Sequence, residues 1–223
     1  TLASVAHDLS NPLTYAMANL EMLLLGDEEE SIELMQDSYE GLLRISDIVR
    51  GLEHRSQERS EVSIEGVIQL ALRSTRAEID ANARLVVDSL DPTISVLGVS
   101  SRLVQVLVNL LTNAAQAIPP GQPDQHEIKI RTVLTPDRVE IVVSDTGHGI
   151  PDSIRDRVKE PFFTTKSAGE GTGLGLAICS RIVDEHGGSL RFSSGDVGAQ
   201  VTVSLPRLQR QDPIVETDSA IPV

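Results

Sequence analysis

Apolar residues recur every three or four positions along two neighbouring segments at the start of the chain. They are Leu2, Val5, Leu9, Leu13, Ala16, Leu20 and Leu23 in the first segment, and Ile32, Met35, Tyr39, Leu42, Ile45, Val49 and Leu52 in the second. This spacing is typical of amphipathic helices. Because Gly26 and Asp27 separate the segments, we expect an antiparallel helical hairpin over residues 1–56.

A hairpin of this length buries too little apolar surface to be stable alone. Each helix carries an almost continuous apolar seam. We therefore expect two copies of the chain to form a homodimer through a four-helix bundle. Packing of the hairpin on the rest of the chain is the alternative.

The pattern changes after residues 57–62, which are polar and are expected to be a linker. From there to residue 206 the pattern predicts helices at 63–81, 100–118 and 172–186, and strands at 84–88, 94–97, 127–134, 138–144, 189–193 and 200–205. Ser63, and either Ser100 or Ser101, are the expected N-caps. The order predicts an α+β sandwich, with helices on one face of a largely antiparallel sheet. Residues 207–223 lack periodicity, and we expect a disordered tail.

Composition narrows the function. The 223 residues carry a net charge of −14, and 40% are hydrophobic. The acidic balance argues against binding to nucleic acid or to an anionic membrane, both of which require Lys and Arg. One cysteine excludes an internal disulfide and a cysteine-based zinc site. No apolar run reaches the ~18 residues of a membrane span. We expect a cytoplasmic fragment without membrane contact; the chain begins at Thr1 without Met, so the full-length protein can still be membrane-anchored.

Charge also separates the two regions. Residues 1–58 hold twelve acidic and three basic side chains, whereas residues 62–206 hold seventeen and thirteen. The acidity therefore belongs chiefly to the predicted hairpin, which indicates two regions with different surfaces.

His7 is the first candidate for chemistry. At about 100° per residue it lies nearly opposite the apolar seam of its predicted helix. Pro12 follows inside the helical pattern, where proline costs about 3 kcal/mol and kinks the helix. An exposed His7–Asp8 pair next to a costly kink favours a functional site over ordinary surface.

Four further motifs belong to the region from residue 63 to 206. Asn109 and Asn113 share one face of a helix, and carboxamides can hold phosphates and hydrated Mg²⁺ without anionic repulsion. Asp145 ends a strand before Gly147 and Gly149, where a carboxylate can accept a hydrogen bond from an exocyclic amine. A solvated helix face and a simple turn are the respective alternatives.

Glycines from Gly169 to Gly175 precede the last predicted helix, and their backbone donors suit an anion such as a phosphate. The segment P-F-F-T-T-K, residues 161–166, contains two of the three phenylalanines and lies between the two glycine motifs. We interpret it as the anchor of a mobile lid, with Lys166 able to reach a phosphate. A flexible linker and ordinary loop packing are the alternatives.

In this order, the motifs resemble the catalytic core of bacterial sensor histidine kinases. They are H-D-L-S-N-P from His7, Q-V-L-V-N-L-L-T-N-A-A-Q-A from Gln105, D-T-G-H-G-I from Asp145, P-F-F-T-T-K from Pro161 and G-E-G-T-G-L-G-L-A-I from Gly169. The resemblance covers roughly residues 1–206. It implies a dimerisation and phosphotransfer hairpin joined to an ATP-binding domain of the GHKL type.

The resemblance also implies residue roles. His7 accepts the γ-phosphoryl group of ATP and Asp8 orients it, while Asn11 suggests dephosphorylation of a partner. Asn113, with Asn109 nearby, holds Mg²⁺ and phosphates, and Asp145 recognises the adenine amine. The remaining residues implied to surround the nucleotide are Gly147, Gly149, Thr165, Lys166, Gly171, Thr172, Gly173, Leu174 and Gly175.

The implied partner is the receiver domain of a response regulator, whose aspartate takes the phosphoryl group from His7. One departure from the family is Gln116, which stands where many relatives carry a basic residue; Lys166 is the candidate replacement for that charge. Another GHKL ATPase and a non-catalytic dimeric ATP-sensing scaffold are the alternative functions. His7 argues against the first, and the intact Asn, Asp and Gly motifs against the second.

Overall fold

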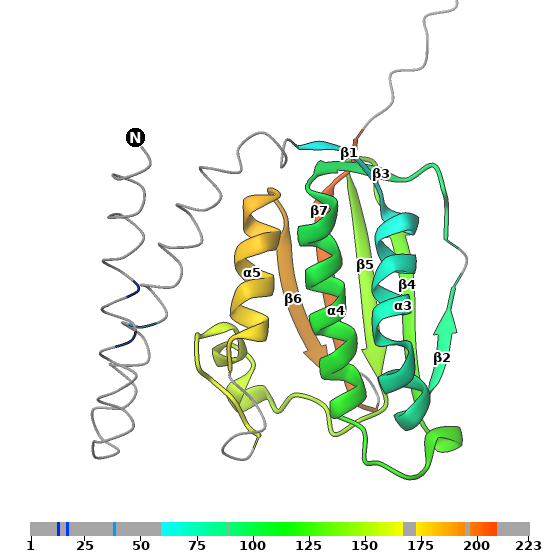
Figure 1. The fold of residues 1–223 in the computed structure, drawn as a ribbon, viewed down its shortest axis with the longest axis vertical. Coiled ribbons are helices and arrows are strands. Elements are labelled where there is room, and N and C mark those ends of the chain that lie inside the picture. Colours follow the sequence, from blue (N-terminus) through cyan, green and yellow to red (C-terminus); the bar gives the residue numbers. More distant parts are fainter. Residues whose placement is uncertain are drawn as a thin grey trace, which may run out of the picture.

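The computed structural model describes residues 59–88, 90–166, 173–194 and 197–208, together with Leu13, Met17 and Ser38 (Figure 1). The expected hairpin lies almost wholly outside the described residues, and so do His7, Asp8 and Asn11. Gly171 and Thr172 also lie outside them. The hairpin, its dimer and the division of the chain at residue 56 therefore stay predictions.

The described part is an α+β sandwich, as the pattern predicts. Its five-stranded sheet has the order β2-β4-β5-β7-β6, with the bounds β2 (Arg84–Val87), β4 (Glu127–Leu134), β5 (Arg138–Asp145), β6 (Ser189–Ser194) and β7 (Ala199–Pro206). β2 is parallel to β4, and the other pairs are antiparallel. The largely antiparallel sheet expected from the sequence is confirmed.

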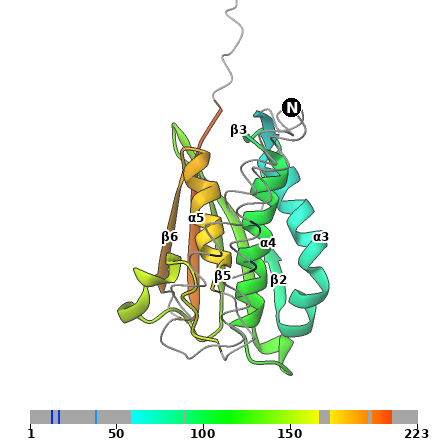
Figure 2. The same ribbon diagram turned by 60° about the vertical axis from the view of Figure 1, so that its left-hand side comes forward.

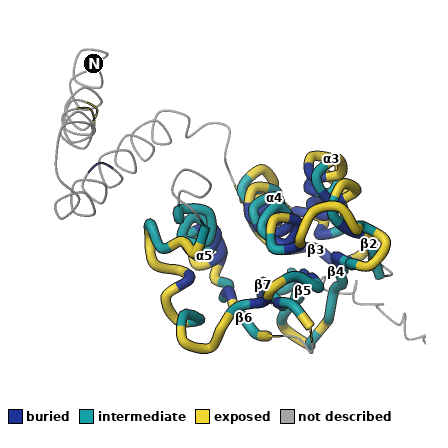
Figure 3. Tube along the Cα trace, turned by 90° about the horizontal axis from the view of Figure 1, so that it is seen from below, coloured by how far each residue is buried: buried dark blue, intermediate teal, exposed yellow. Residues whose placement is uncertain are grey.

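Three helices cover one face of this sheet, as Figures 2 and 3 show: α3 (Ile64–Asn82), α4 (Ser100–Gln116) and α5 (Gly175–Glu185). Short 3-10 helices lie in the connections, namely η1 (Pro123–Gln125), η2 (Asp152–Ile154) and η3 (Arg157–Lys159). None of the described helices combines the length and apolar content needed to cross a membrane.

The core lies between the helices and the sheet. The apolar face predicted for α4 is buried at Leu103, Val106, Leu107, Leu110 and Ala114. On β5 the alternating residues Val139, Ile141 and Val143 are buried against it, and Asp145 continues their side of the strand. The packing that builds the core thus also turns the Asp145 carboxylate inward.

The domain begins earlier than expected. Residues 60–62, interpreted as part of the linker, belong to β1 (Ser60–Ser63), which pairs antiparallel with β3 (Ser95–Gly98). Only Val62 of this strand is buried, so its sequence lacks an apolar alternation. The domain also ends later: Arg207 and Leu208, expected in the tail, donate backbone hydrogen bonds to Asp137 and Ser95.

One helix cap and one helix start differ from the prediction. Ser63 caps α3 as expected, accepting a hydrogen bond from the N–H of Gly66 at 3.3 Å. Neither predicted serine caps α4: the cap position is Val99, without a side-chain hydrogen bond to the helix. The last helix, expected from residue 172, begins only at Gly175.

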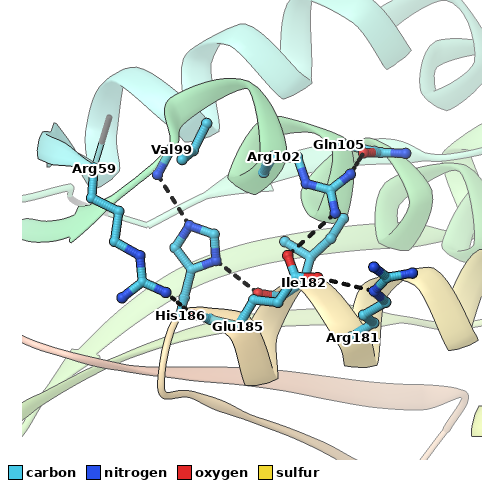
Figure 4. Close-up of polar contacts among 8 residues, drawn as sticks. All are labelled: Arg59, Val99, Arg102, Gln105, Arg181, Ile182, Glu185 and His186. Atoms are coloured by element: carbon cyan, nitrogen blue, oxygen red, sulfur yellow. Dashed lines mark hydrogen bonds and ion pairs between the residues drawn. The ribbon is translucent and has the colours of Figure 1, made fainter. Parts of the chain in front are cut away.

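A histidine joins the end of α5 to the start of α4 (Figure 4). Nδ1 of the buried His186 lies 2.7 Å from the carbonyl oxygen of Ile182, and Nε2 accepts a hydrogen bond from the N–H of Val99 at 3.1 Å. The two bonds together assign the proton to Nδ1. His186 therefore satisfies the end of its own helix and also holds the backbone that leads into α4.

Charged groups surround this histidine on the outside (Figure 4). The guanidinium of Arg59 donates to the carbonyl oxygen of Glu185, at the C-terminal end of α5. Arg102 and Arg181 pair with the Glu185 carboxylate at 3.4 Å and 2.9 Å. A cation at a helix C-terminus is favourable, so the first described residue of the domain is tied to the end of α5.

Candidate functional site

A cavity of about 650 Å³ opens at the C-terminal end of α4, bounded by the end of β5, the segment 148–166 and the start of α5. Its lining brings together residues from the four motifs of the domain. They are Asn113, Asp145, Gly149, Thr165, Lys166, Gly173 and Gly175. Residues separated by up to 62 positions in the sequence, from Asn113 to Gly175, therefore converge on one site.

Asp145 supplies a fixed acceptor in this cavity. Its Oδ1 accepts hydrogen bonds from the N–H of Gly147 at 2.8 Å and of Ala199 at 3.3 Å. Burial raises the pKa of the Asp145 carboxyl above its usual value, while the two backbone bonds and His148 act in the opposite direction. None of the described residues donates to Oδ2. One oxygen is thus anchored, and the other can accept a hydrogen bond from a ligand amine.

Apolar side chains surround that carboxylate. Val143, Ile150 and Ile154 line the cavity together with Phe163 and Phe192. This combination of apolar walls with one placed acceptor suits a flat heterocycle that carries an amino group. Gly147 allows the backbone after β5 to pack closely against the end of α4. A Cβ atom at this position would lie 2.4 Å from the carbonyl oxygen of Ala117.

The two asparagines of the motif on α4 take different positions. Asn113 is half-buried and lines the cavity. Asn109 is not among the lining residues; its carboxamide donates to the carbonyl oxygen of Gly175 at 3.4 Å. The structure therefore places Asn109 against the first turn of α5, and only Asn113 where it can face a ligand.

Lys166 is the one lysine or arginine among the described lining residues. Its ammonium donates to Oε1 of Gln116, in the last turn of α4, and its backbone N–H donates to Oγ1 of Thr164 at 3.1 Å. Lys166, the candidate replacement for a basic residue at position 116, thus contacts the glutamine that stands there. That Lys166 neutralises phosphate remains a prediction.

The segment before Lys166 is fastened to the sheet. The guanidinium of Arg155 donates to Oγ of Ser194 at 3.0 Å, and Oγ of Ser194 donates to the carbonyl oxygen of Ile150 at 3.1 Å. The guanidinium of Arg157 lies 4.6 Å from the centre of the Phe163 ring. These contacts anchor one end of the segment interpreted as a lid.

Phe162 marks the strained point of this segment. Its φ of 66° is the one positive value among the described non-glycine residues. A Cβ atom on Gly173 would lie 2.3 Å from the carbonyl carbon of Phe162. A bulky residue in the left-handed region is rare, and such strain gathers at binding sites. The two motifs therefore meet through backbone contact between Phe162 and Gly173.

Other predicted residues are placed less directly. Gly147 and Leu174 adjoin the cavity without being among its lining residues. His148 is exposed and lines the cavity, and Cys179 is fully buried. Burial raises the pKa of the Cys179 thiol to about 12.

The strands β6 and β7 contribute residues that sequence reasoning missed. Phe192, Ala199 and Val201 line the cavity, and Ala199 also donates to Asp145. Gly198 precedes Ala199 with a φ of 79°. The only signal for this region is Gly198, two residues before the strand predicted at 200–205, and a glycine there by itself indicates just a turn.

The donor set fits a magnesium ion that is held mainly by a ligand's phosphates. Among the described residues there is no group of three His, Cys, Asp or Glu side chains that could hold a metal. Asn113 offers a neutral carboxamide oxygen in the cavity. Mg²⁺ commonly binds through one or two protein oxygens, water and substrate phosphates, and this cavity can supply the protein's share.

A layer of three helices on a five-stranded sheet, with such a cavity at one end, agrees with the ATP-binding domain that the sequence motifs imply. The model of the histidine kinase-, DNA gyrase B-, and HSP90-like ATPase family matches residues 98–209. The chain belongs to this family.

Individual relatives narrow the comparison. The chain is 31% identical over 220 residues to the sensory histidine kinase/phosphatase NtrB of Rhodobacter capsulatus, covering 91% of this chain and 60% of NtrB. It spans 54% to 60% of the length of three NtrB relatives, and 34% to 46% of the length of other curated sensor proteins that it matches.

Solved structures agree with this comparison. The mycobacterial sensor histidine kinase MprB is 33% identical with a TM-score of 0.56, and the match covers 67% of this chain and 97% of that one. The crystal structure of the histidine kinase ThkA in complex with the response regulator TrrA is 26% identical with a TM-score of 0.57. That match covers 93% of this chain and 61% of that one.

Proposed function

We propose that this chain is the core of a cytoplasmic two-component sensor histidine kinase. It binds ATP with Mg²⁺ in the cavity, transfers the γ-phosphoryl group to His7, and passes it to an aspartate of a response regulator receiver domain. The observation that carries the proposal is the convergence of Asn113, Asp145 and Lys166 on one cavity, in a chain that also contains the motif His7 to Pro12.

The cavity has two chemically different ends. The ionised Asp145 accepts a hydrogen bond from the adenine amine between apolar walls. Asn113 and Lys166 face the triphosphate, and Gly173 and Gly175 offer backbone donors at the start of α5. Bound Mg²⁺ supplies neutralisation of phosphate charge. Phosphoryl transfer depends chiefly on such alignment and charge stabilisation.

The first transfer is balanced within the chain and its substrate. A ring nitrogen of His7 attacks the γ-phosphorus, a nitrogen–phosphorus bond forms, and the bond to the leaving ADP oxygen breaks. Asp8 takes the ring proton and fixes the tautomer. Because His7 and the cavity belong to different regions, residues 53–58, which precede Arg59, act as the hinge that lets the ATP-binding domain approach the hairpin.

The second transfer goes from His7 to the receiver aspartate. Asn11, one helical turn after His7, orients water for the reverse activity, the dephosphorylation of the partner. A homodimer supplies the four-helix bundle that presents His7. The acidic hairpin steers a receiver with a complementary basic surface, so we expect partner phosphotransfer to slow as salt concentration rises.

One experiment tests the kinase proposal. The full chain is incubated with γ-labelled ATP and Mg²⁺, and the bound label is tested for acid lability and base stability. We expect stable incorporation that disappears in His7→Ala. Labelling that persists in this variant would contradict the proposal, whereas ATP binding without any labelling would favour the non-catalytic scaffold.

A further inference from the structure

We propose that Glu78, a residue of α3 outside all of the motifs, positions the phosphate end of the site. Through Gln116 it holds the ammonium of Lys166 toward the phosphates of ATP. This inference rests on the proposed ATP site and adds a residue to it. Glu78 itself does not line the cavity, so it acts through the two residues that do.

The carboxylate of Glu78 is held at both oxygens by α4. Its Oε1 accepts a hydrogen bond from Nε2 of Gln116 at 3.0 Å, and its Oε2 accepts one from Oγ1 of Thr112 at 3.1 Å. Thr112 and Gln116 lie one turn apart on the same face of the helix. The carboxylate is therefore fixed against the last turn of α4, beside the mouth of the cavity.

This contact decides which way the Gln116 carboxamide points. A carboxylate only accepts hydrogen bonds, so it selects the amide nitrogen of Gln116 and turns Oε1 the other way. The opposite orientation would place Oε1 against the carboxylate and the amide nitrogen against the Lys166 ammonium. The network thus assigns Oε1 to Lys166, and the hydrogen bond from the ammonium of Lys166 is to that atom.

Lys166 is suited to act at the end of this relay. An ammonium group has three donors, and the bond to Gln116 uses one of them. The backbone of Lys166 is fixed by Thr164, and the side chain is half-buried at the end of α4, where the helix dipole favours a cation. A lysine oriented in this way keeps two donors for phosphate oxygens without losing its place on the wall.

The competing explanation is that Glu78 merely joins α3 to α4. The two explanations differ in the ligands that they affect. Loosening the contact between the two helices would weaken the binding of all three ligands and would lower the stability of the domain. Misplacing Lys166 would weaken the binding of ATP and ADP. It would leave the binding of adenosine unchanged, because adenosine has no phosphate.

The test measures the binding of ATP, ADP and adenosine to the full chain by titration calorimetry with Mg²⁺. For Glu78→Ala we expect ATP binding to weaken about fivefold to tenfold and adenosine binding to stay unchanged. Gln116→Ala, at an exposed site in the last turn of α4, should reproduce this result even if Glu78→Ala folds poorly. In a Lys166→Ala background, neither Glu78→Ala nor Gln116→Ala should weaken ATP binding further.

Glu65→Ala is the matched control, because Glu65 also accepts from a glutamine, Gln69, at 2.9 Å on the same helix. Glu65→Ala should leave the binding of ATP, ADP and adenosine unchanged. Equal weakening of adenosine and ATP, wild-type ATP binding in Glu78→Ala, or full additivity with Lys166→Ala would each overturn the relay. Failure of the unsubstituted chain to bind any nucleotide would instead overturn the proposed function, and the relay with it.

Discussion

The carbonyl oxygen of Asp145 lies only 2.0 Å from the position that a Cβ atom on Gly198 would occupy, and Oδ1 of Asp145 lies 2.9 Å from it. Gly198 has a φ of 79°, a conformation that residues with a side chain rarely adopt. The loop before β7 can therefore pass directly over the end of β5. This close passage brings the N–H of Ala199 to the carboxylate.

Gly198→Ala should disrupt the adenine end of the site. The added methyl group has no room and the backbone is strained, so we expect a loss of about 2 kcal/mol in the free energy of unfolding. Nucleotide binding should be abolished as Ala199 moves away from Asp145. Urea unfolding and calorimetric titration with ATP measure the two effects.

Gly121→Ala separates backbone strain from this contact. Gly121 has a φ of 101°, but a Cβ atom there would meet nothing within 4 Å. The control should lose about 1 kcal/mol of stability and should bind ATP normally. Similar ATP binding by the two variants would refute the role given to Gly198.

Asp145→Asn should separate binding from stability. The Asn oxygen can still accept from Gly147 and Ala199, but its amide nitrogen would face the adenine amine, donor against donor. We expect nucleotide binding to weaken by about 2 kcal/mol, or roughly 30-fold. Stability should not fall, because the substitution removes a charge that the fold disfavours.

The pH dependence of this variant follows from the raised pKa of Asp145. A carboxyl group whose pKa is raised on folding binds its proton more tightly in the folded chain. Its effect on stability is therefore most favourable below the usual value of 3.8, and is lost as pH rises through the folded pKa. Relative to wild type, Asp145→Asn should gain stability from acidic to neutral pH. A constant difference in urea unfolding across this range would contradict the assignment.

Local sequence patterns predicted the layers of the fold because burial repeats along each element. Leu103, Leu107 and Leu110 mark one face of α4 at helical spacing, and all three are buried. The start of that helix at Ser100 was predicted, but its cap was not, because the adjacent serines look like caps. The contact that holds Val99 comes instead from His186, 87 positions away. β1 was missed because it is an exposed strand with one buried side chain, Val62.

The residues of the site likewise fall into those that a local sequence pattern predicts and those that it does not. Asn113, Asp145 and Lys166 were predicted because each is a chemically distinctive side chain inside a recognisable motif. Ala199 was not, because it acts through its backbone N–H, which every residue except proline possesses. Glu78 was not, because it meets Gln116 only after α3 and α4 have packed. Such contacts are products of the fold and leave no local pattern.

Cys179, the one cysteine of the chain, should report the opening of the core. It is fully buried, and burial raises the pKa of its thiol to about 12, so little reactive thiolate exists in the folded state. We expect no labelling by iodoacetamide at pH 8 and full labelling in urea. ATP should slow labelling at intermediate urea, because ligand binding stabilises the folded state. Rapid labelling of the native chain would contradict the buried assignment.

His186→Ala should weaken the junction between α4 and α5. The substitution removes both ring hydrogen bonds and leaves the N–H of Val99 without its partner. It also opens a space beside Gly98, where a Cβ atom would lie 2.6 Å from the imidazole. We expect a loss of about 3 kcal/mol in the free energy of unfolding. Urea unfolding monitored by circular dichroism measures it.

His126→Ala is the comparison, because His126 is only half-buried and its ring has a single hydrogen-bond contact, with Thr146 at 3.1 Å. This substitution should lower the free energy of unfolding by less than about 1 kcal/mol. His186 lies at the opposite end of α5 from Gly175, which lines the cavity. If the junction only stabilises the domain, ATP affinity of the folded His186→Ala variant should equal that of wild type.

Equal losses of stability in His186→Ala and His126→Ala would contradict the role of His186 as a clamp. A changed ATP affinity in His186→Ala would mean that α5 transmits the disturbance along its whole length to the site.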